Sequence, residues 1–399
     1  MTSLALALAS CAPAFAQDGR RPDAADQYPP LEAVYDRMRD AAARNPGFAE
    51  FIDLTMTYSV PTTHEGRHIF ALKVSDNAAE REDEPNILVV AQHHGDELIA
   101  SQVALHFMDK LLDGSVIDGR ERKLVTDNAV FICPVWNPDG YASVRRLNAR
   151  KNENGSTGVD LNRNYPFGWG TCGGSPVVGS ATYRGPEPAS EPETQTMIAF
   201  ARDQRFARMH DLHAGAFEAR VGYGCWVHPW NEFLLQEARA SVQAGGMDAE
   251  SRNSCCHAGD IHFNMSESLT FAVLWEVHQN KRPPIDQVPA RAEQMYDAMF
   301  HTLARPTSIS GHATDASTGE PVYARIELTT AGFEQGEGAL CHGPAARYDL
   351  VLPPGQHTIR FSADGYEAIE KVVLCTPESE ETLEVSLTPM PPANLPDSP

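Results

Sequence analysis

A short polar run joins a strand pattern to a helix pattern in the first third of this 399-residue chain. Residues 87–92 are mostly apolar and predict a buried strand, and residues 98–112 predict an amphipathic helix. The run between them is His94-Gly95-Asp96-Glu97. Further strand and helix patterns alternate up to residue 303, as is typical of crossover connections between parallel strands. The chain therefore predicts an α/β fold with a mixed, mainly parallel sheet flanked by helices.

His94 and Glu97 are three residues apart at this turn, so both side chains can reach one cation. Imidazole nitrogen and carboxylate oxygen suit Zn²⁺, and a catalytic zinc takes three protein ligands. The spacing alone also fits a loop histidine beside a glutamate favoured by the helix dipole. A third ligand should end another strand, and residues 208–215 offer His210 and His213, which face opposite sides of a strand. His213, at the glycine-containing end, is the expected ligand, and His210 is expected to be structural.

A long loop and one strand end supply further reactive groups. The loop at residues 137–189 is rich in Gly and Asn, and loops of this length are often functional. It carries Arg150 and the pair Asn162-Arg163, and arginine is suited to binding a carboxylate through two hydrogen bonds. Glu276 closes the apolar run at residues 269–275 and is a candidate general base. Glu267 is the competing candidate, in a Ser-rich segment.

Charge and the N-terminus constrain partners and compartment. The formal net charge is −22, which argues against nucleic acid as a partner. Residues 1–16 predict a signal peptide, with an apolar stretch and an Ala14-Phe15-Ala16 cleavage site. Residues 8–11 also fit a lipoprotein motif, in which Cys11 would carry a lipid. We expect an exported protein, periplasmic or secreted, and no transmembrane segment.

The composition changes after residue 306. A flexible lead-in is expected at residues 17–27, an α/β domain at 28–305, a small all-β sandwich at 307–388 and a disordered, proline-rich tail at 389–399. Cys341 and Cys375 both lie in the β-rich part and could form a disulfide in an exported protein.

Residues 28–303 resemble a zinc metallocarboxypeptidase of the carboxypeptidase A and carboxypeptidase D type. The resemblance rests on the order and spacing of several motifs: His94-Gly95-Asp96-Glu97, Asn137-Pro138-Asp139-Gly140-Tyr141, Arg150-Lys151-Asn152, Val159-Asp160-Leu161-Asn162-Arg163-Asn164, Thr182-Tyr183-Arg184-Gly185, Asp211-Leu212-His213 and Glu276. Residues 308–387 similarly resemble the transthyretin-like domain that follows the catalytic domain in carboxypeptidase D relatives.

The resemblance implies one Zn²⁺ per chain and a role for each matched residue. The implied zinc ligands are His94, Glu97 and His213. Glu276 would be the general base and Arg150 the arginine that stabilises the transition state. The implied groups that bind or orient are Asn162 and Arg163 for the substrate carboxylate and Asp160 for the first ligand histidine. The expected partners are the C-termini of peptides or proteins.

The chain departs from the family between the third ligand and the base. The family usually has a mobile tyrosine there, and this sequence has no Tyr between Tyr223 and Tyr296. Counting back from Glu276 puts either Ile261 or Asp260 in the specificity pocket. Ile261 would favour an apolar C-terminal residue, and Asp260 would favour Lys or Arg, which we expect here.

Other functions remain open at this point. The same fold could cleave peptidoglycan stem peptides or act as an amidohydrolase on small acylated amino acids, and a binding module without activity is the alternative outside enzymes. The sequence leaves the oligomeric state open.

Overall fold

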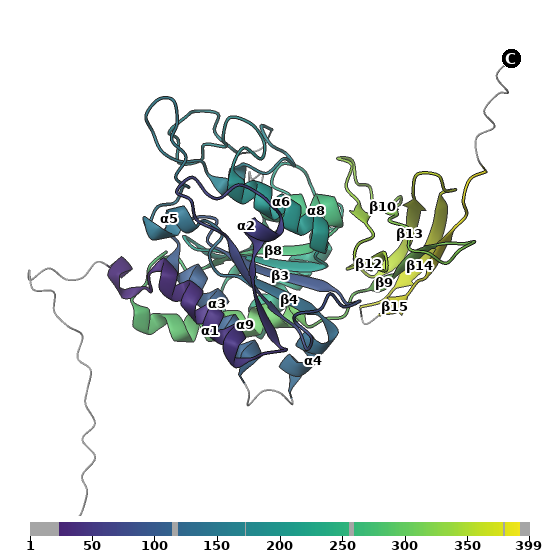
Figure 1. Cartoon of the computed structure of the whole chain (residues 1–399), viewed down its shortest axis with the longest axis horizontal. Coiled ribbons are helices and arrows are strands. Elements are labelled where there is room, and N and C mark those ends of the chain that lie inside the picture. The colour runs from purple at the N-terminus through teal and green to yellow at the C-terminus, as the bar shows by residue number, and fades with distance from the viewer. Residues whose placement is uncertain (1–23, 114–118, 172, 255–258, 378–379, 392–399) are drawn as a thin grey trace, which may run out of the picture.

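The computed structural model describes residues 24–113, 119–171, 173–254, 259–377 and 380–391 (Figure 1). The expected signal peptide and Cys11 lie outside the described residues. No described helix is long and apolar enough to cross a bilayer. The helical elements are η1 (Ala24–Gln27), α1 (Leu31–Arg44), α2 (Leu54–Thr57), α3 (Leu98–Leu112), α4 (Arg120–Asp127), α5 (Pro138–Ala142), η2 (Leu161–Arg163), α6 (Pro192–Gln204), α7 (Asn231–Ala244), α8 (Asp260–Ser268), η3 (Ile285–Gln287) and α9 (Val288–Leu303).

Eight described strands form one mixed sheet in the order β1-β2-β4-β3-β5-β8-β6-β7. The central neighbours β4, β3, β5 and β8 run parallel, while β1–β2, β2–β4 and β6–β8 pair antiparallel. The strands are β1 (Ala49–Asp53), β2 (Phe70–Val74), β3 (Asn86–Ala91), β4 (Ala129–Cys133), β5 (Arg208–His213), β6 (Phe217–Val221), β7 (Glu250–Asn253) and β8 (Phe271–Val277). The predicted α/β architecture is confirmed.

Helices cover both faces of this sheet (Figure 1). Helices α1, α3 and α9 lie on one side, and α6 and α8 lie on the other. Every residue of β3 and β4 is buried. Strands covered on both faces in this way consist of nearly continuous apolar runs, as these two do. The apolar stripe of α3 packs in the same core, through residues such as Ile99, Val103 and Phe107. This packing fixes the strand ends where the reactive side chains lie.

The C-terminal part is a separate all-β unit with its own core. One sheet has the order β11-β10-β13-β14, and the other joins β12, β9 and β15, with β16 also paired to β9. Side chains of β13 alternate between buried and exposed, as expected when one face of a sheet packs on another. The strands are β9 (Ile309–Asp315), β10 (Arg325–Leu328), β11 (Ala339–Leu340), β12 (Arg347–Leu350), β13 (Gly355–Ser362), β14 (Ile369–Cys375), β15 (Glu381–Thr382) and β16 (Val385–Leu387).

The suggested disulfide between Cys341 and Cys375 is wrong, since both are buried free thiols. Cys341 follows β11 and Cys375 ends β14, at opposite edges of one sheet. Three strand spacings separate these edges by about 14 Å, and a disulfide needs Cα atoms within about 7 Å. Cys225, in the α/β domain, does take part in a disulfide.

Candidate active site

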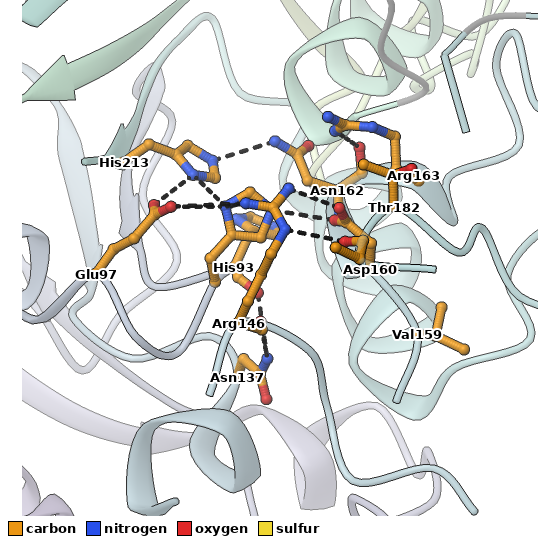
Figure 2. Close-up of polar contacts among 12 residues, drawn as sticks. His93, Glu97, Asn137, Arg146, Val159, Asp160, Asn162, Arg163, Thr182 and His213 are labelled. Carbon is orange, nitrogen blue, oxygen red and sulfur yellow. Dashed lines mark hydrogen bonds and ion pairs between the residues drawn. The ribbon is translucent and has the colours of Figure 1, made fainter. Parts of the chain in front are cut away.

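Three potential metal ligands converge at the ends of β3 and β5. His94 and Glu97 lie in the turn from β3 to α3, and His213 is the last residue of β5. One ligand atom from each lies within 4.8 Å of the others, and all three residues are buried. His94 Nδ1 is 3.0 Å from His213 Nδ1 and 3.1 Å from Glu97 Oε1. His213 Nδ1 lies 2.9 Å from Glu97 Oε2 (Figure 2). The sequence motif therefore does form a compact ligand cluster.

A carboxylate holds the far nitrogen of each histidine. Asp160 Oδ1 lies 3.0 Å from His94 Nε2, and Asp211 Oδ2 lies 2.7 Å from His213 Nε2. These contacts place the protons on the Nε2 atoms, so the Nδ1 atoms can turn their lone pairs toward the same point. A bound cation satisfies both lone pairs, and carboxylate–histidine–metal arrangements of this kind orient zinc ligands. The donor set therefore fits Zn²⁺.

The charges of the cluster stabilise its carboxylates in the ionised form. Burial would raise the pKa of Glu97, but His94 and His213 outweigh it and hold that pKa well below the usual range. Burial likewise acts on Asp160, where Arg146 and His94 hold the pKa well below its usual value. Both groups are therefore negatively charged and able to bind or orient ligands at neutral pH.

Arg146, rather than Arg150, lies at this cluster. Arg146 Nη2 donates to Asp160 Oδ2 at 2.6 Å, and Nη1 lies 3.2 Å from His94 Nδ1. Arg150 Nη1 instead donates to the buried Glu191 at 2.9 Å, and Arg150 does not line the cavity. The family resemblance implies Arg150 through the Arg150-Lys151-Asn152 motif, but two arginines four residues apart cannot be told apart by spacing.

Asn162 and Arg163 lie on the far side of the cluster, in η2 (Figure 2). Asn162 Nδ2 is 3.2 Å from His213 Nε2, and its buried Oδ1 has no hydrogen-bond partner among the described residues. Arg163 donates from Nη1 to the Asn162 carbonyl at 2.7 Å. Both line the cavity, so the expected carboxylate-binding pair has the access that this role requires.

Glu276 reaches the same cavity from β8. It pairs in register with His213 on the neighbouring parallel strand, so the two side chains emerge at the same level of the sheet. Its Oε2 atom is buried and has no hydrogen-bond partner in the described structure, and Oε1 lies 3.5 Å from Arg220 Nη2. Glu276 therefore lines the cavity with a carboxylate oxygen whose hydrogen-bonding capacity is unused within the described residues.

Asp260 and Ile261 are both buried at the start of α8, and neither lines this cavity. Asp260 Oδ2 lies 3.7 Å from His93 Nε2. Burial raises the pKa of Asp260 to about 8, and the neighbouring Asp211 adds to the effect. Counting back from Glu276 assumes that no residue is inserted before it. The two residues that the count gives do not line the cavity.

Several residues of the site were not identified from the sequence. Arg146, Arg220 and Lys281 line the cavity, and Asp211 orients His213. Lys281 Nζ lies 3.0 Å from Asp96 Oδ2 and 3.2 Å from Glu97 Oε1. The strand period could have found Asp211, because residues two apart on a strand point to the same face. Long-range pairs such as Lys281 with Asp96 have no signal in the spacing.

His210 has the structural role expected of it. Its Nε2 contacts Thr302 Oγ1 at 2.8 Å, and Trp275 donates to its Nδ1 at 2.7 Å. Burial lowers the pKa of His210 to about 3. A neutral, fully bonded imidazole in the core has no capacity left for a ligand.

The zinc carboxypeptidase family model matches residues 37–304. The chain belongs to this family. Human carboxypeptidase N catalytic chain is 24% identical over 376 residues, covering 83% of this chain and 80% of the relative. Carboxypeptidase A2 of Rattus norvegicus is 29% identical, over 50% of this chain and 48% of the relative. These comparisons agree with the ligand cluster: the chain is a zinc metallocarboxypeptidase, a peptide hydrolase with zinc as its cofactor.

Solved carboxypeptidases share the fold of the catalytic domain. Carboxypeptidase A from Helicoverpa armigera superposes with a TM-score of 0.63 at 22% identity, covering 70% of this chain and 74% of the other. At that identity the likeness supports the fold alone. The carboxypeptidase N relative aligns over a larger share of this chain than residues 37–304 provide, so that alignment extends into the C-terminal β-unit.

Proposed function

We propose that this chain is an exported carboxypeptidase that removes single residues from the C-termini of peptides or proteins. The observation that carries the proposal is the convergence of the ligand cluster, Glu276 and Arg163 on one cavity of about 230 Å³. Export is supported by the signal-like residues 1–16 and by the disulfide at Cys225, since disulfides persist in oxidising compartments.

In this proposal His94, Glu97 and His213 hold the zinc. Bound Zn²⁺ supplies a Lewis acid that polarises the scissile carbonyl and makes water easier to deprotonate. Glu276 takes the proton from the attacking water at its unpartnered Oε2 atom and gives it to the leaving amine. Asp160 and Asp211 keep the ligand imidazoles in the required tautomer throughout.

Two arginines bind the charged parts of the substrate. Arg163 and Asn162 hold the terminal carboxylate, which restricts cleavage to the last peptide bond. Arg146, at the ligand cluster, stabilises the oxyanion that develops on the scissile carbonyl, the role that the sequence suggested for Arg150. Arg146 is suited to this role because its Nη2 atom donates to Asp160 Oδ2 at 2.6 Å, which holds the guanidinium in place.

The cavity charge favours an acidic rather than a basic C-terminal residue. Four cationic side chains line the cavity, namely Arg146, Arg163, Arg220 and Lys281, against two carboxylates, Glu97 and Glu276. Arg220 contacts Glu276 inside the cavity and Glu218 outside its lining, and Lys281 likewise contacts Glu97 inside it and Asp96 outside its lining. We therefore propose that Arg220 and Lys281 attract an acidic side chain, and the preference for Lys or Arg expected through Asp260 has no support from its position.

The test is a set of peptides that differ only at the C-terminus, assayed with and without a chelator. We expect chelator-sensitive release of the last residue, with kcat/KM highest for Glu or Asp and lowest for Lys. Peptides amidated at the C-terminus should not be cleaved. Cleavage of amidated peptides, or of peptidoglycan stem peptides alone, would contradict the proposed substrate class, and equal rates for Glu and Lys would contradict the charge argument.

A further inference from the structure

A second cavity lies between the α/β domain and the C-terminal β-unit, away from the zinc ligands. Its volume is about 240 Å³. The α/β side contributes Arg208, Phe233 and Phe271 to its lining, and the β-unit contributes Val351 and Leu352. Arg208 is the first residue of β5, so it lies at the opposite end of that strand from His213. The cavity is therefore separated from the catalytic site by the length of a strand.

Arg208 is a buried cation whose side chain has no partner among the described residues. The residue is 2% exposed, and its Nη2 atom has no hydrogen-bond partner among the described residues. No ion pair of Arg208 exists within the described chain. Burial lowers the pKa of Arg208 to about 10, although the charge of Asp349 acts in the opposite direction. A guanidinium of this pKa is still charged at neutral pH, and an unpaired buried charge costs several kcal/mol.

The charged groups that act on the pKa of Arg208 form no ion pair with it in the described structure. Glu237 and Arg305 line the same cavity, but they form an ion pair with each other. Arg305 also donates from Nη2 to the Pro377 carbonyl at 3.1 Å. Asp349, whose field acts most strongly on Arg208, is bound by Arg347 at 2.8 Å. Glu380 also acts on the pKa of Arg208 but lines a different cavity, so the guanidinium has no ion-pair partner among the described residues.

Seven of the thirteen other described residues that line the cavity are apolar. They are two aromatic rings, two aliphatic side chains and three prolines: Phe233, Phe271, Val351, Leu352, Pro306, Pro354 and Pro377. Ligand sites commonly combine apolar side chains with a small number of precisely placed polar groups. A guanidinium offers two parallel N–H donors, which match a carboxylate. The single net charge favours a monoanion over a phosphate dianion.

We propose that this interdomain cavity binds a small carboxylic acid with an apolar or aromatic body, its carboxylate on Arg208. The bound acid contacts both units at once and stabilises their association. The site is independent of the proposed catalytic function, because none of its lining residues contacts the zinc cluster.

Phenylacetate is a suitable probe, and phenylacetamide is its neutral control. Because Arg163 could also bind a carboxylate, the zinc-loaded Arg163→Met variant serves as the background in which binding is measured by calorimetry. We expect one saturable phenylacetate site and a higher Tm, with phenylacetamide binding at least about tenfold more weakly, since hydrogen bonds to charged groups are worth 1.5–3 kcal/mol. Adding Arg208→Met should abolish this site while zinc content stays unchanged.

Three outcomes would overturn the proposal: no phenylacetate binding to the Arg163→Met protein, equal binding of phenylacetamide, or binding that survives Arg208→Met. If Arg208→Met does not fold, crystals of the wild-type chain soaked with 4-bromophenylacetate decide the question. The anomalous signal of bromine should lie among Phe233, Phe271 and Leu352, and bromine found only at the zinc site would also overturn it.

Discussion

Glu276 is the residue on which the proposed chemistry depends most directly. Replacing it by Gln keeps the size of the side chain but removes the base that accepts the water proton. We expect Glu276→Gln to bind zinc normally and to lose about 10²–10⁴-fold in kcat. Zinc content by atomic absorption and peptide kinetics measure the two effects separately.

Glu267→Gln is the matched control. Glu267 lies in α8, pairs with Arg202 at 3.1 Å and does not line the cavity. Its replacement should leave kcat unchanged within about twofold, as for surface substitutions generally. A large loss of kcat in Glu267→Gln with none in Glu276→Gln would reverse the two assignments.

The two arginines of the long loop make a second residue-level test. Arg146→Met should lower kcat by about 10²–10³-fold, the usual cost of one oxyanion donor. Because Arg146 also bonds Asp160, zinc content must be measured to separate catalysis from ligand orientation. Arg150→Met should have near-normal kcat, since Arg150 contacts Glu191 outside the cavity. A greater loss of kcat in Arg150→Met would restore the role first expected from its sequence position.

At the scale of elements, the turn between β3 and α3 must approach α5 closely. A Cβ atom added at Gly95 would lie 2.1 Å from the Gly140 carbonyl carbon and 2.3 Å from the Tyr141 nitrogen. Backbone atoms cannot move aside as a flexible side chain can. Gly95 therefore has a steric role in placing His94 and Glu97.

Gly95→Ala should accordingly destabilise the chain by about 3 kcal/mol or more, at the upper end of overpacking costs. The free energy of unfolding in urea and the zinc content are the measurements. Gly66→Ala is the control, because Gly66 has a positive φ of 79° but no atom within 4 Å of an added Cβ. It should lose about 1–2 kcal/mol from backbone strain alone. Equal losses in both variants would mean that the close approach to α5 does not matter.

The elements also show what the sequence could and could not predict. Periodicity identifies β3, α3 and β8, because a parallel strand covered on both faces must be apolar throughout. Local spacing therefore identifies His94 and Glu97 in the turn after β3, and Glu276 near the end of β8. No local pattern encodes the loops and strand registers that bring three other side chains to the cavity, those of Arg146, Arg220 and Lys281. The same holds for Cys341 and Cys375, whose separation depends on strand order rather than on spacing.

At the scale of the whole molecule, a histidine links the β-unit to the α/β domain. His312 in β9 places Nε2 2.8 Å from Asp83 Oδ2, across the two units, and Nδ1 3.0 Å from Glu384 Oε1 within the β-unit. Arg347 donates to the Asp83 carbonyl at 2.9 Å beside it. Burial lowers the pKa of His312, but the two carboxylates outweigh that effect and raise it above its usual value.

This raised pKa predicts how the association of the two units depends on pH. A group whose pKa is higher in the folded state stabilises that state fully below its unfolded pKa, about 6.5 for histidine. The stabilisation is then lost as the pH rises through the higher, folded pKa. The Tm of the β-unit and its resistance to proteolysis near residue 306 should therefore fall from pH 6 toward alkaline pH. His312→Gln should remove this part of the dependence, because glutamine keeps a hydrogen bond to Asp83 but binds no proton. If His312→Gln and wild type lose Tm equally over this range, the contact of His312 with Asp83 does not control the association, and other groups between the two units must.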